Sequence, residues 1–132
     1  MLLLDTHILI WWIDDSNKLS RTAAARIEEA IKSDEAIIVS SISAWEIAML
    51  VEKNRLKLTI DVDSWLQTVS EIDQVRFIAV DNKVALESTR LPGDFHKDPA
   101  DRMIVALART LAIPLITTDE KMLAYKYVKT IF

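Results

Sequence analysis

Short, nearly continuous apolar runs alternate along the chain with longer segments whose apolar residues recur every three or four positions. The short runs predict five strands, the first four of them buried on both faces, at 1–4, 36–40, 77–80, 114–117 and 128–132. The longer segments predict helices at 6–12, after Ser20, from 41–43 to 53, and at 61–72, 81–90, 99–112 and 119–126. Strands alternating with helices predict βαβ units, so we expect an α/β fold, one parallel sheet between two helix layers, in a single domain over residues 1–132.

Composition narrows the class of protein. Hydrophobic residues make up 51% of the 132 positions, which is enough for one real core, and the absence of cysteine excludes disulfides, thiolate metal sites and cysteine nucleophiles. No apolar run is long enough to span a membrane, and Asp5 and His7 interrupt the apolar start, which also lacks the basic region of a targeting signal. We therefore expect a cytoplasmic protein without a membrane partner. The net charge of −4 argues against a basic surface that wraps nucleic acid.

Acidic residues stand where strands end and helices begin. Asp5 ends the first strand, Glu46 lies in the first turn of the helix after the second strand, and Asp119 follows the strand at 114–117. Asp98 and Asp101 open the helix that precedes that strand. The carboxyl ends of parallel strands and the amino ends of the helices that follow them lie on one edge of the sheet. The acids at 5, 46, 101 and 119 are therefore predicted to share one rim.

Each acid also has a local explanation as a helix cap. Asp98 before Pro99 is a typical helix start, and Glu46 three residues after Ser43 fits a capping box. The acids after the first and fourth strands could cap the helices that begin there. Capping explains each acid singly better than it explains the whole set. Serine or threonine would cap a helix equally well. Four carboxylates gathered on one rim would also repel one another.

A bound divalent cation relieves that repulsion. An all-oxygen site selects Mg²⁺ or Mn²⁺ over Zn²⁺, and such ions can activate a water for attack on a phosphodiester without a side-chain nucleophile. The cation would also attract the phosphate group, which a chain of net charge −4 does not. Lys97 and Arg102 could assist, whereas the basic run at 53–57 is more typical of solvated surface.

Four motifs in order, LLLDTHILIWW, SAWEIA, HKDPADRMIVALA and LITTDEKMLAY, cover nearly the whole chain. They resemble PIN-domain nucleases, most closely the VapC-type toxins of bacterial toxin–antitoxin pairs. The resemblance implies a three-layer PIN-like fold whose parallel five-stranded sheet has the order 3-2-1-4-5. It also implies a Mg²⁺- or Mn²⁺-dependent endoribonuclease, a toxin that hydrolyses RNA phosphodiesters with a metal-activated water. The implied partners are an RNA substrate, a cognate antitoxin and a second copy in a homodimer.

The resemblance also assigns roles to residues. It implies a catalytic and metal-binding set made up of Asp5, Glu46, Asp101 and Asp119. Within this set, Asp5 and Asp101 are expected to be direct ligands of the cation. Supporting roles fall to Thr6, Asp98, Thr117 and Arg102. For Arg102, restraint of a neighbouring carboxylate and contact with phosphate both remain open.

Two other interpretations use the same acids. In a phosphatase, Asp5 would be the nucleophile, but that chemistry favours an acid two residues later, where this chain has His7. The chain could instead be a non-catalytic binding domain with an acidic pocket. The complete set of acids argues against lost catalysis. His96 could approach substrate or make a structural hydrogen bond in its loop, so it is assigned no catalytic role.

Overall fold

The sheet of the computed structural model, which describes residues 1–132, has five parallel strands in the order β3-β2-β1-β4-β5. This confirms the predicted strand order. The strands are β1 (Leu2–Leu4), β2 (Ile37–Ser40), β3 (Val75–Ile78), β4 (Leu115–Ile116) and β5 (Thr130–Ile131). The helices are α1 (Thr6–Ile13), α2 (Arg21–Lys32), α3 (Ser41–Glu52), α4 (Val62–Ser70), α5 (Asn82–Ser88), α6 (Pro99–Leu111) and α7 (Glu120–Ala124).

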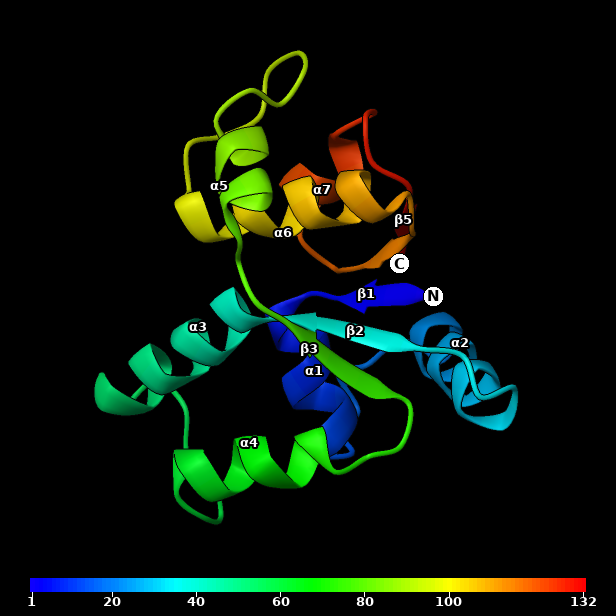
Figure 1. Cartoon of the computed structure of the whole chain (residues 1–132). Helices are drawn as coiled ribbons and strands as arrows, with labels where there is room; N and C mark the ends of the chain where they lie inside the picture. Colours follow the sequence, from blue (N-terminus) through cyan, green and yellow to red (C-terminus); the bar gives the residue numbers. More distant parts are fainter.

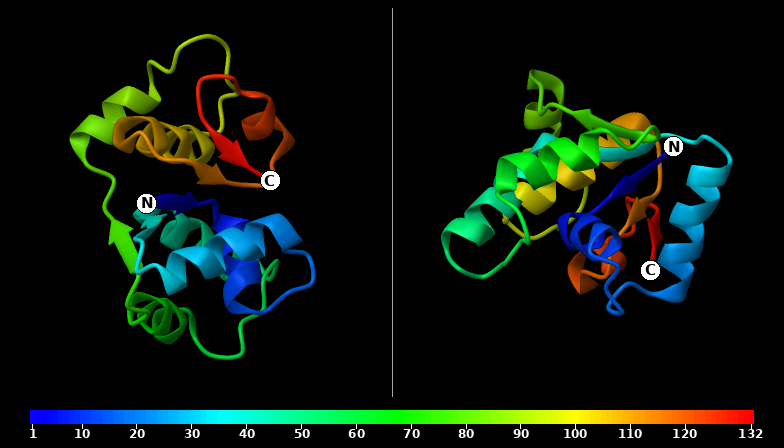
Figure 2. Two further views of the ribbon diagram at one scale, coloured as in Figure 1. Left: turned by 90° about the vertical axis from the view of Figure 1, so that its right-hand side faces the viewer. Right: turned by 90° about the horizontal axis from the view of Figure 1, so that it is seen from below.

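Helices cover both faces of the sheet. In Figure 1, α5, α6 and α7 lie above the sheet and α1, α2, α3 and α4 below it, and the left view of Figure 2 separates the same two layers. Side chains of the strands alternate between the layers because successive residues point to opposite faces. Leu2 and Leu4 belong to the core on the α1 side, whereas Leu3 belongs to the core on the α6 side.

The carboxyl edge of the sheet carries the helix starts that matter for function. The helices α1 and α3 begin directly after β1 and β2, and α6 begins on the same side of the molecule (Figure 1). Asp5, Asp98 and Asp119 are the N-caps of α1, α6 and α7, so all three predicted capping contacts are present. This edge therefore brings acids together, and capping is part of how it does so.

Three local predictions need correction. The capping box was wrong: Ser40 is the N-cap of α3, Ser43 is fully buried, and Glu46 lies in the second turn rather than the first. Strand β3 begins two residues earlier than predicted and ends two residues earlier, at Ile78. Only Val75 of its four residues is buried, so the predicted burial on both faces is wrong for β3, which lies at the edge of the sheet. None of the helices combines the length and the apolar character that crossing a bilayer requires.

Candidate active site

Asp5 ties the end of β1 to the neighbouring strand β4. One carboxylate oxygen, Oδ1, accepts a hydrogen bond from the backbone N–H of Thr6 at 2.8 Å, and Oδ2 accepts one from Thr117 Oγ1 at 2.7 Å. Asp5 is only 8% exposed. Burial raises the pKa of this carboxyl, while the hydrogen bonds from Thr117 and Thr6 lower it. The contact with Thr117 is possible because strands far apart in sequence are neighbours where the strand order reverses.

Glu46 is held by a pair of hydroxyls. Thr6 Oγ1 donates to Glu46 Oε1 at 2.7 Å and lies 2.8 Å from Ser43 Oγ. Thr6 has a single hydroxyl proton, so Ser43 is the donor in the second contact. Burial, and then the charges of Asp5 and Asp98, raise the pKa of Glu46. The result is a chain of hydroxyls that aims this carboxylate from α3 toward the start of α1.

The first turn of α6 places two further acids. Asp98 Oδ1 accepts a hydrogen bond from the backbone N–H of Asp101 at 3.0 Å, which completes the cap. Asp101 is partly buried, and its pKa is raised to about 7, first by burial and then by Asp98, Asp5, Asp119 and Glu46. All these carboxylates are thus close enough to act on one another's charge. Asp101 is therefore the acid whose pKa is raised by the charges of all four neighbouring carboxylates.

His96 lies against Asp101. Its Nε2 is 2.9 Å from Asp101 Oδ2, but the pair lacks the geometry of a hydrogen bond and the buried Nε2 has no hydrogen-bond partner. A structural hydrogen bond through Nε2, one of the roles left open for this histidine, is absent, and the ring lies beside Asp101.

Arg102 positions the loop before α6. Its Nε donates to the carbonyl of Ser88 at 2.8 Å, and its Nη1 donates to the carbonyls of Phe95 and His96 at 2.9 and 3.1 Å. Arg102 forms no ion pair with a carboxylate, so the restraint of a neighbouring carboxylate that was left open is absent. The guanidinium instead holds three backbone carbonyls.

Asp119 completes the rim from the start of α7. Its Oδ1 accepts hydrogen bonds from the backbone N–H groups of Lys121 and Met122, and its own N–H donates to Thr117 Oγ1 at 3.0 Å. Thr117 therefore links Asp119 to Asp5 through one hydroxyl. This places both threonines predicted from the sequence, Thr6 and Thr117, directly beside acids of the predicted set.

An acidic cavity opens over these groups. It has a volume of about 550 Å³ and no hydrophobic lining residue; it is lined by His96, Asp98, Asp101, Asp119, Glu120 and Lys121. Asp5, which is buried, and Glu46, which lines a neighbouring cavity, are not part of the lining. Five carboxylate oxygens accept no hydrogen bond from the chain: Glu46 Oε2, Asp98 Oδ2, Asp101 Oδ1 and Oδ2, and Asp119 Oδ2.

The carboxylates fit a divalent cation in chemistry, although they are not drawn into a finished coordination shell. No three acidic or histidine side chains stand close enough together to hold a metal ion as they are placed. The pKa values of Asp5, Glu46 and Asp101 are nevertheless raised, and a bound divalent cation would stabilise their ionised forms. Carboxylate oxygens without a hydrogen-bond donor are also free to coordinate such a cation. The predicted acids lie on one rim and act on one another's charge, but as placed they do not surround a single ion.

Three residues at the site were missed or misread from the sequence. Ser43 was read as a cap, yet it stands three residues before Glu46 on the same face of α3, which is the signal that could have paired them. His96 needed the folded loop to reveal its contact with Asp101. Lys121 lines the cavity two residues after Asp119, where a cation beside an acid could have been noticed.

Comparison with known proteins identifies the family of this fold and site. The family model described as PIN domain matches residues 2–127. The chain belongs to the PIN domain family. This PIN domain is 38% identical over 125 residues to the ribonuclease VapC22 of Mycobacterium tuberculosis, covering 95% of this chain and 92% of VapC22.

Solved structures match the same architecture. The VapBC2 complex of Rickettsia felis, bound to a DNA fragment from its promoter, contains a chain that matches with a TM-score of 0.72 at 20% identity, covering 98% of this chain and 96% of that one. A chain of a toxin–antitoxin complex from Klebsiella pneumoniae matches with a TM-score of 0.66 at 19% identity, covering 100% and 97%. At these identities the matches establish the fold.

Proposed function

We propose that this PIN domain is a Mg²⁺- or Mn²⁺-dependent endoribonuclease and the toxin of a toxin–antitoxin pair. The observation that carries the proposal is the set of carboxylates from four separate segments that lie at one edge, where burial and then their charges raise the pKa of Asp101 to about 7. The relationship to VapC22, a ribonuclease, supports the choice of RNA as substrate. A net charge of −4 suits an enzyme whose attraction to phosphate comes from a cation.

The cation would be held by Asp5 and Asp101, with Glu46 and Asp119 completing the oxygen set. When bound, it supplies positive charge that activates a water and stabilises the oxygen leaving the phosphodiester. The chain's part is to hold the acids ionised and aimed. Thr117 does this for Asp5, and Thr6 does it for Glu46.

Other side chains build and border the site. Asp98 caps α6 and so sets the direction of its first turn, in which Asp101 lies. Lys121 stands at the rim of the acidic cavity and is the cation of the chain best placed to meet a substrate phosphate. Arg102 has an indirect role, because it donates hydrogen bonds to carbonyls of the loop that carries His96.

The phosphatase interpretation fares worse on this geometry. A nucleophilic aspartate needs an exposed oxygen, whereas Asp5 is buried and both its oxygens accept hydrogen bonds. His7 remains where that chemistry favours a second acid.

The proposed partners are an antitoxin and a second copy of the chain, in the cytoplasm where RNA is available. The toxin–antitoxin complex of Klebsiella pneumoniae supports a protein partner, since its chain shares this fold. The exposed ring of Trp45, 55% accessible, borders a partly apolar cavity that also includes Met49 and Glu46. A partner lying there would cover the acidic edge as well.

The test is cleavage of a labelled RNA by the purified protein with Mg²⁺, with Mn²⁺, and with EDTA. We expect cleavage only with metal, and a loss of at least a hundredfold in Asp5→Ala and Asp101→Ala. Asp14→Asn, an exposed acid at the end of α1, is the matched control and should cleave like wild type. Full activity in both alanine variants would refute the site, and cleavage that persists in EDTA would refute the metal.

A further inference from the structure

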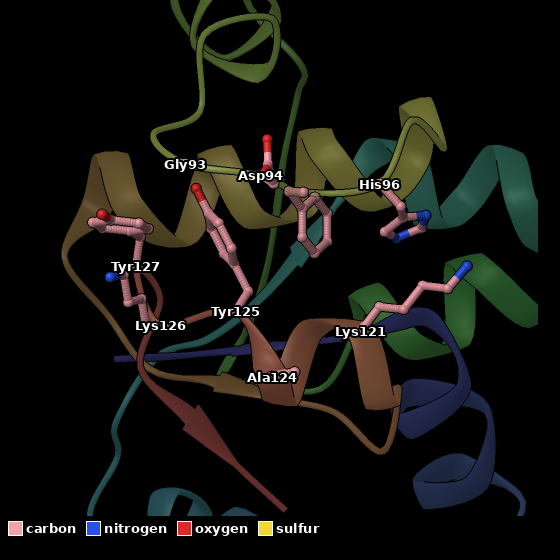
Figure 3. Close-up of a pocket in the computed structure, with 9 residues that line it drawn as sticks. Gly93, Asp94, His96, Lys121, Ala124, Tyr125, Lys126 and Tyr127 are labelled. Carbon is pink, nitrogen blue, oxygen red and sulfur yellow. The ribbon is translucent and has the colours of Figure 1, made fainter.

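A second cavity adjoins the acidic one. It has a volume of about 600 Å³ and lies between the loop before α6 and the segment that follows α7 (Figure 3). It shares His96 and Lys121 with the acidic cavity, so the two cavities are neighbours. Its size falls within the range of small-molecule pockets and is ample for one nucleoside.

Aromatic rings form an unbroken row along this second cavity. Ring centroids are 5.5 Å apart between Tyr127 and Tyr125, 4.8 Å between Tyr125 and Phe95, and 4.5 Å between Phe95 and His96. The row begins at Tyr127, which is 39% exposed, and ends at His96, 2.9 Å from Asp101. A stacking surface therefore leads from solvent to the acid at the centre of the candidate active site.

The row is held in place by backbone contacts. Gly93, the only glycine of the chain, has a φ of +65°, and a Cβ added there would lie 2.8 Å from Tyr127 Cε2. Tyr125 donates its hydroxyl proton to the carbonyl of Pro92, and Arg109 donates to the carbonyl of Tyr127. These contacts fix the loop before α6 and the segment after α7 relative to each other, so the rings have defined positions.

Charged groups border the same cavity. Lys121 and Lys126 line it, and Lys126 Nζ lies 5.2 Å from the centre of the Tyr127 ring. Asp94 is the only acid in the lining. Figure 3 shows Lys121 below His96, and Tyr127 beside Lys126 at the opposite end. Rings flanked by lysines are what single-stranded nucleic acid uses, because bases stack on the rings while phosphates meet the cations.

We propose that the cavity lined by Phe95, Tyr125, Tyr127, Lys121 and Lys126 binds an unpaired stretch of the RNA beside the cleaved phosphodiester, with one base against the exposed Tyr127 ring. The proposal rests on the proposed function for the identity of its ligand. A paired base cannot reach the rings, so the cavity selects single-stranded RNA over duplex. Stacking accepts any base, so it adds affinity with little sequence preference.

The first experiment measures binding by fluorescence anisotropy, in protein carrying Asp101→Asn so that no cleavage occurs. The probes are a fluorescein-labelled RNA hexamer and a hexamer of the same backbone without bases. We expect Tyr127→Leu to weaken binding of the base-bearing hexamer about tenfold and that of the abasic hexamer less than twofold. Tyr127→Phe keeps the ring and should bind like the parent.

The lysines are tested separately. Lys126→Gln should weaken both hexamers by the same few-fold factor, since it meets phosphate. The matched control is Lys57→Gln, an exposed lysine between α3 and α4, which should leave both affinities unchanged. Equal effects of Tyr127→Leu on the two hexamers, or no effect on either, would overturn the proposal.

A measurement that needs no change at Tyr127 guards against misfolding of the variant. Hexamers carrying 2-aminopurine at one position each should show quenched fluorescence at one or two adjacent positions only. Uniform quenching along the hexamer, or none, contradicts a defined base site. If wild type cleaves RNA with Mg²⁺ but Tyr127 is irrelevant to binding, this inference alone fails. If Tyr127-dependent binding is found without any cleavage, the proposed function fails and the nucleotide site stands.

Discussion

Thr117 is the residue that joins two acids of the site, Asp5 and Asp119. Its hydroxyl donates to Asp5 and accepts from the backbone N–H of Asp119, so one side chain joins the ends of β1 and β4. The hydroxyl lowers the pKa of Asp5, which burial raises. Removing it would leave a buried carboxylate oxygen and a backbone N–H without partners, and such groups are costly.

Thr117→Val should therefore destabilise the protein by about 1–3 kcal/mol and reduce RNA cleavage. Because the lost hydrogen bond favours the ionised form of Asp5, the acid limb of the pH–rate profile should move to higher pH. Thr117→Ser keeps the hydroxyl and should restore most of both properties. Denaturant unfolding and pH–rate curves measure the two effects, and a valine variant with an unshifted profile would disconnect Thr117 from Asp5.

Asp101 makes the stability of the metal-free protein depend on pH. Its pKa is about 7 in the folded state, against 3.8 for an ordinary aspartate. Between these values the folded state binds more protons than the unfolded state, so the free energy of unfolding falls as the pH rises through that interval. In EDTA, Asp101→Asn should flatten this fall by on the order of 1 kcal/mol, allowing for partial solvent screening. Identical urea-unfolding curves against pH for both proteins would contradict the assignment.

The helix N-caps show which features of the structure could be predicted from the sequence. Asp98 before Pro99 and Ser20 before α2 were predicted as caps because their signals lie within one turn. The cap of α3 was misassigned because Ser40, Ser41 and Ser43 compete within one stretch. What places Ser43 is a hydrogen bond to Thr6, 37 positions away, which no local pattern contains. The acids of the rim were predictable from topology; their hydroxyl partners and the aromatic row, which joins residues about thirty positions apart, were not.

The loop that leads into α6 depends on one side chain of that helix. Arg102 bonds the carbonyls of Ser88, Phe95 and His96, so it fastens the end of α5 and the aromatic loop to α6. Lysine has the charge but cannot direct several donors in one plane. The connection between α5 and α6 is therefore an extension of α6 rather than a free loop.

Arg102→Lys should destabilise the protein by about 1–3 kcal/mol and speed amide hydrogen exchange in residues 93–97 more than elsewhere. The comparison variant is Arg21→Lys, an exposed arginine at the start of α2, for which no change is expected. Exchange that increases evenly over the whole chain would mean that Arg102 stabilises the fold generally and has no special hold on this loop.

At the scale of the whole molecule, folding concentrates negative charge where the sheet order reverses. The carboxylates there come from residues 5 to 119, so no fragment of the chain contains the full set. Their repulsion opposes folding, and no three of them are close enough to hold an ion without adjustment. A cation that binds the folded edge but not the unfolded chain would offset the repulsion between the carboxylates. Such binding would stabilise the whole folded protein, by an amount that depends on the affinity for the metal.

Adding Mn²⁺ or Mg²⁺ should therefore raise the melting temperature of the whole protein, and the rise should be larger at pH 8 than at pH 6. The reason is that protons compete with the ion for Asp101, whose pKa is about 7. A metal concentration one hundred times the dissociation constant corresponds to about 2.7 kcal/mol of added stability. Differential scanning calorimetry at several metal concentrations measures this shift.

The matched pair for this experiment is Asp101→Asn and Asp14→Asn. Each removes one negative charge, but only the first removes a carboxylate from the rim. If the metal acts by general screening of a chain with net charge −4, both variants should lose the same part of the shift. If it binds at the rim, Asp101→Asn should lose nearly all of the shift and its pH dependence, while Asp14→Asn keeps both. The two variants thus separate a bound ion from an ionic atmosphere without any measurement of RNA cleavage.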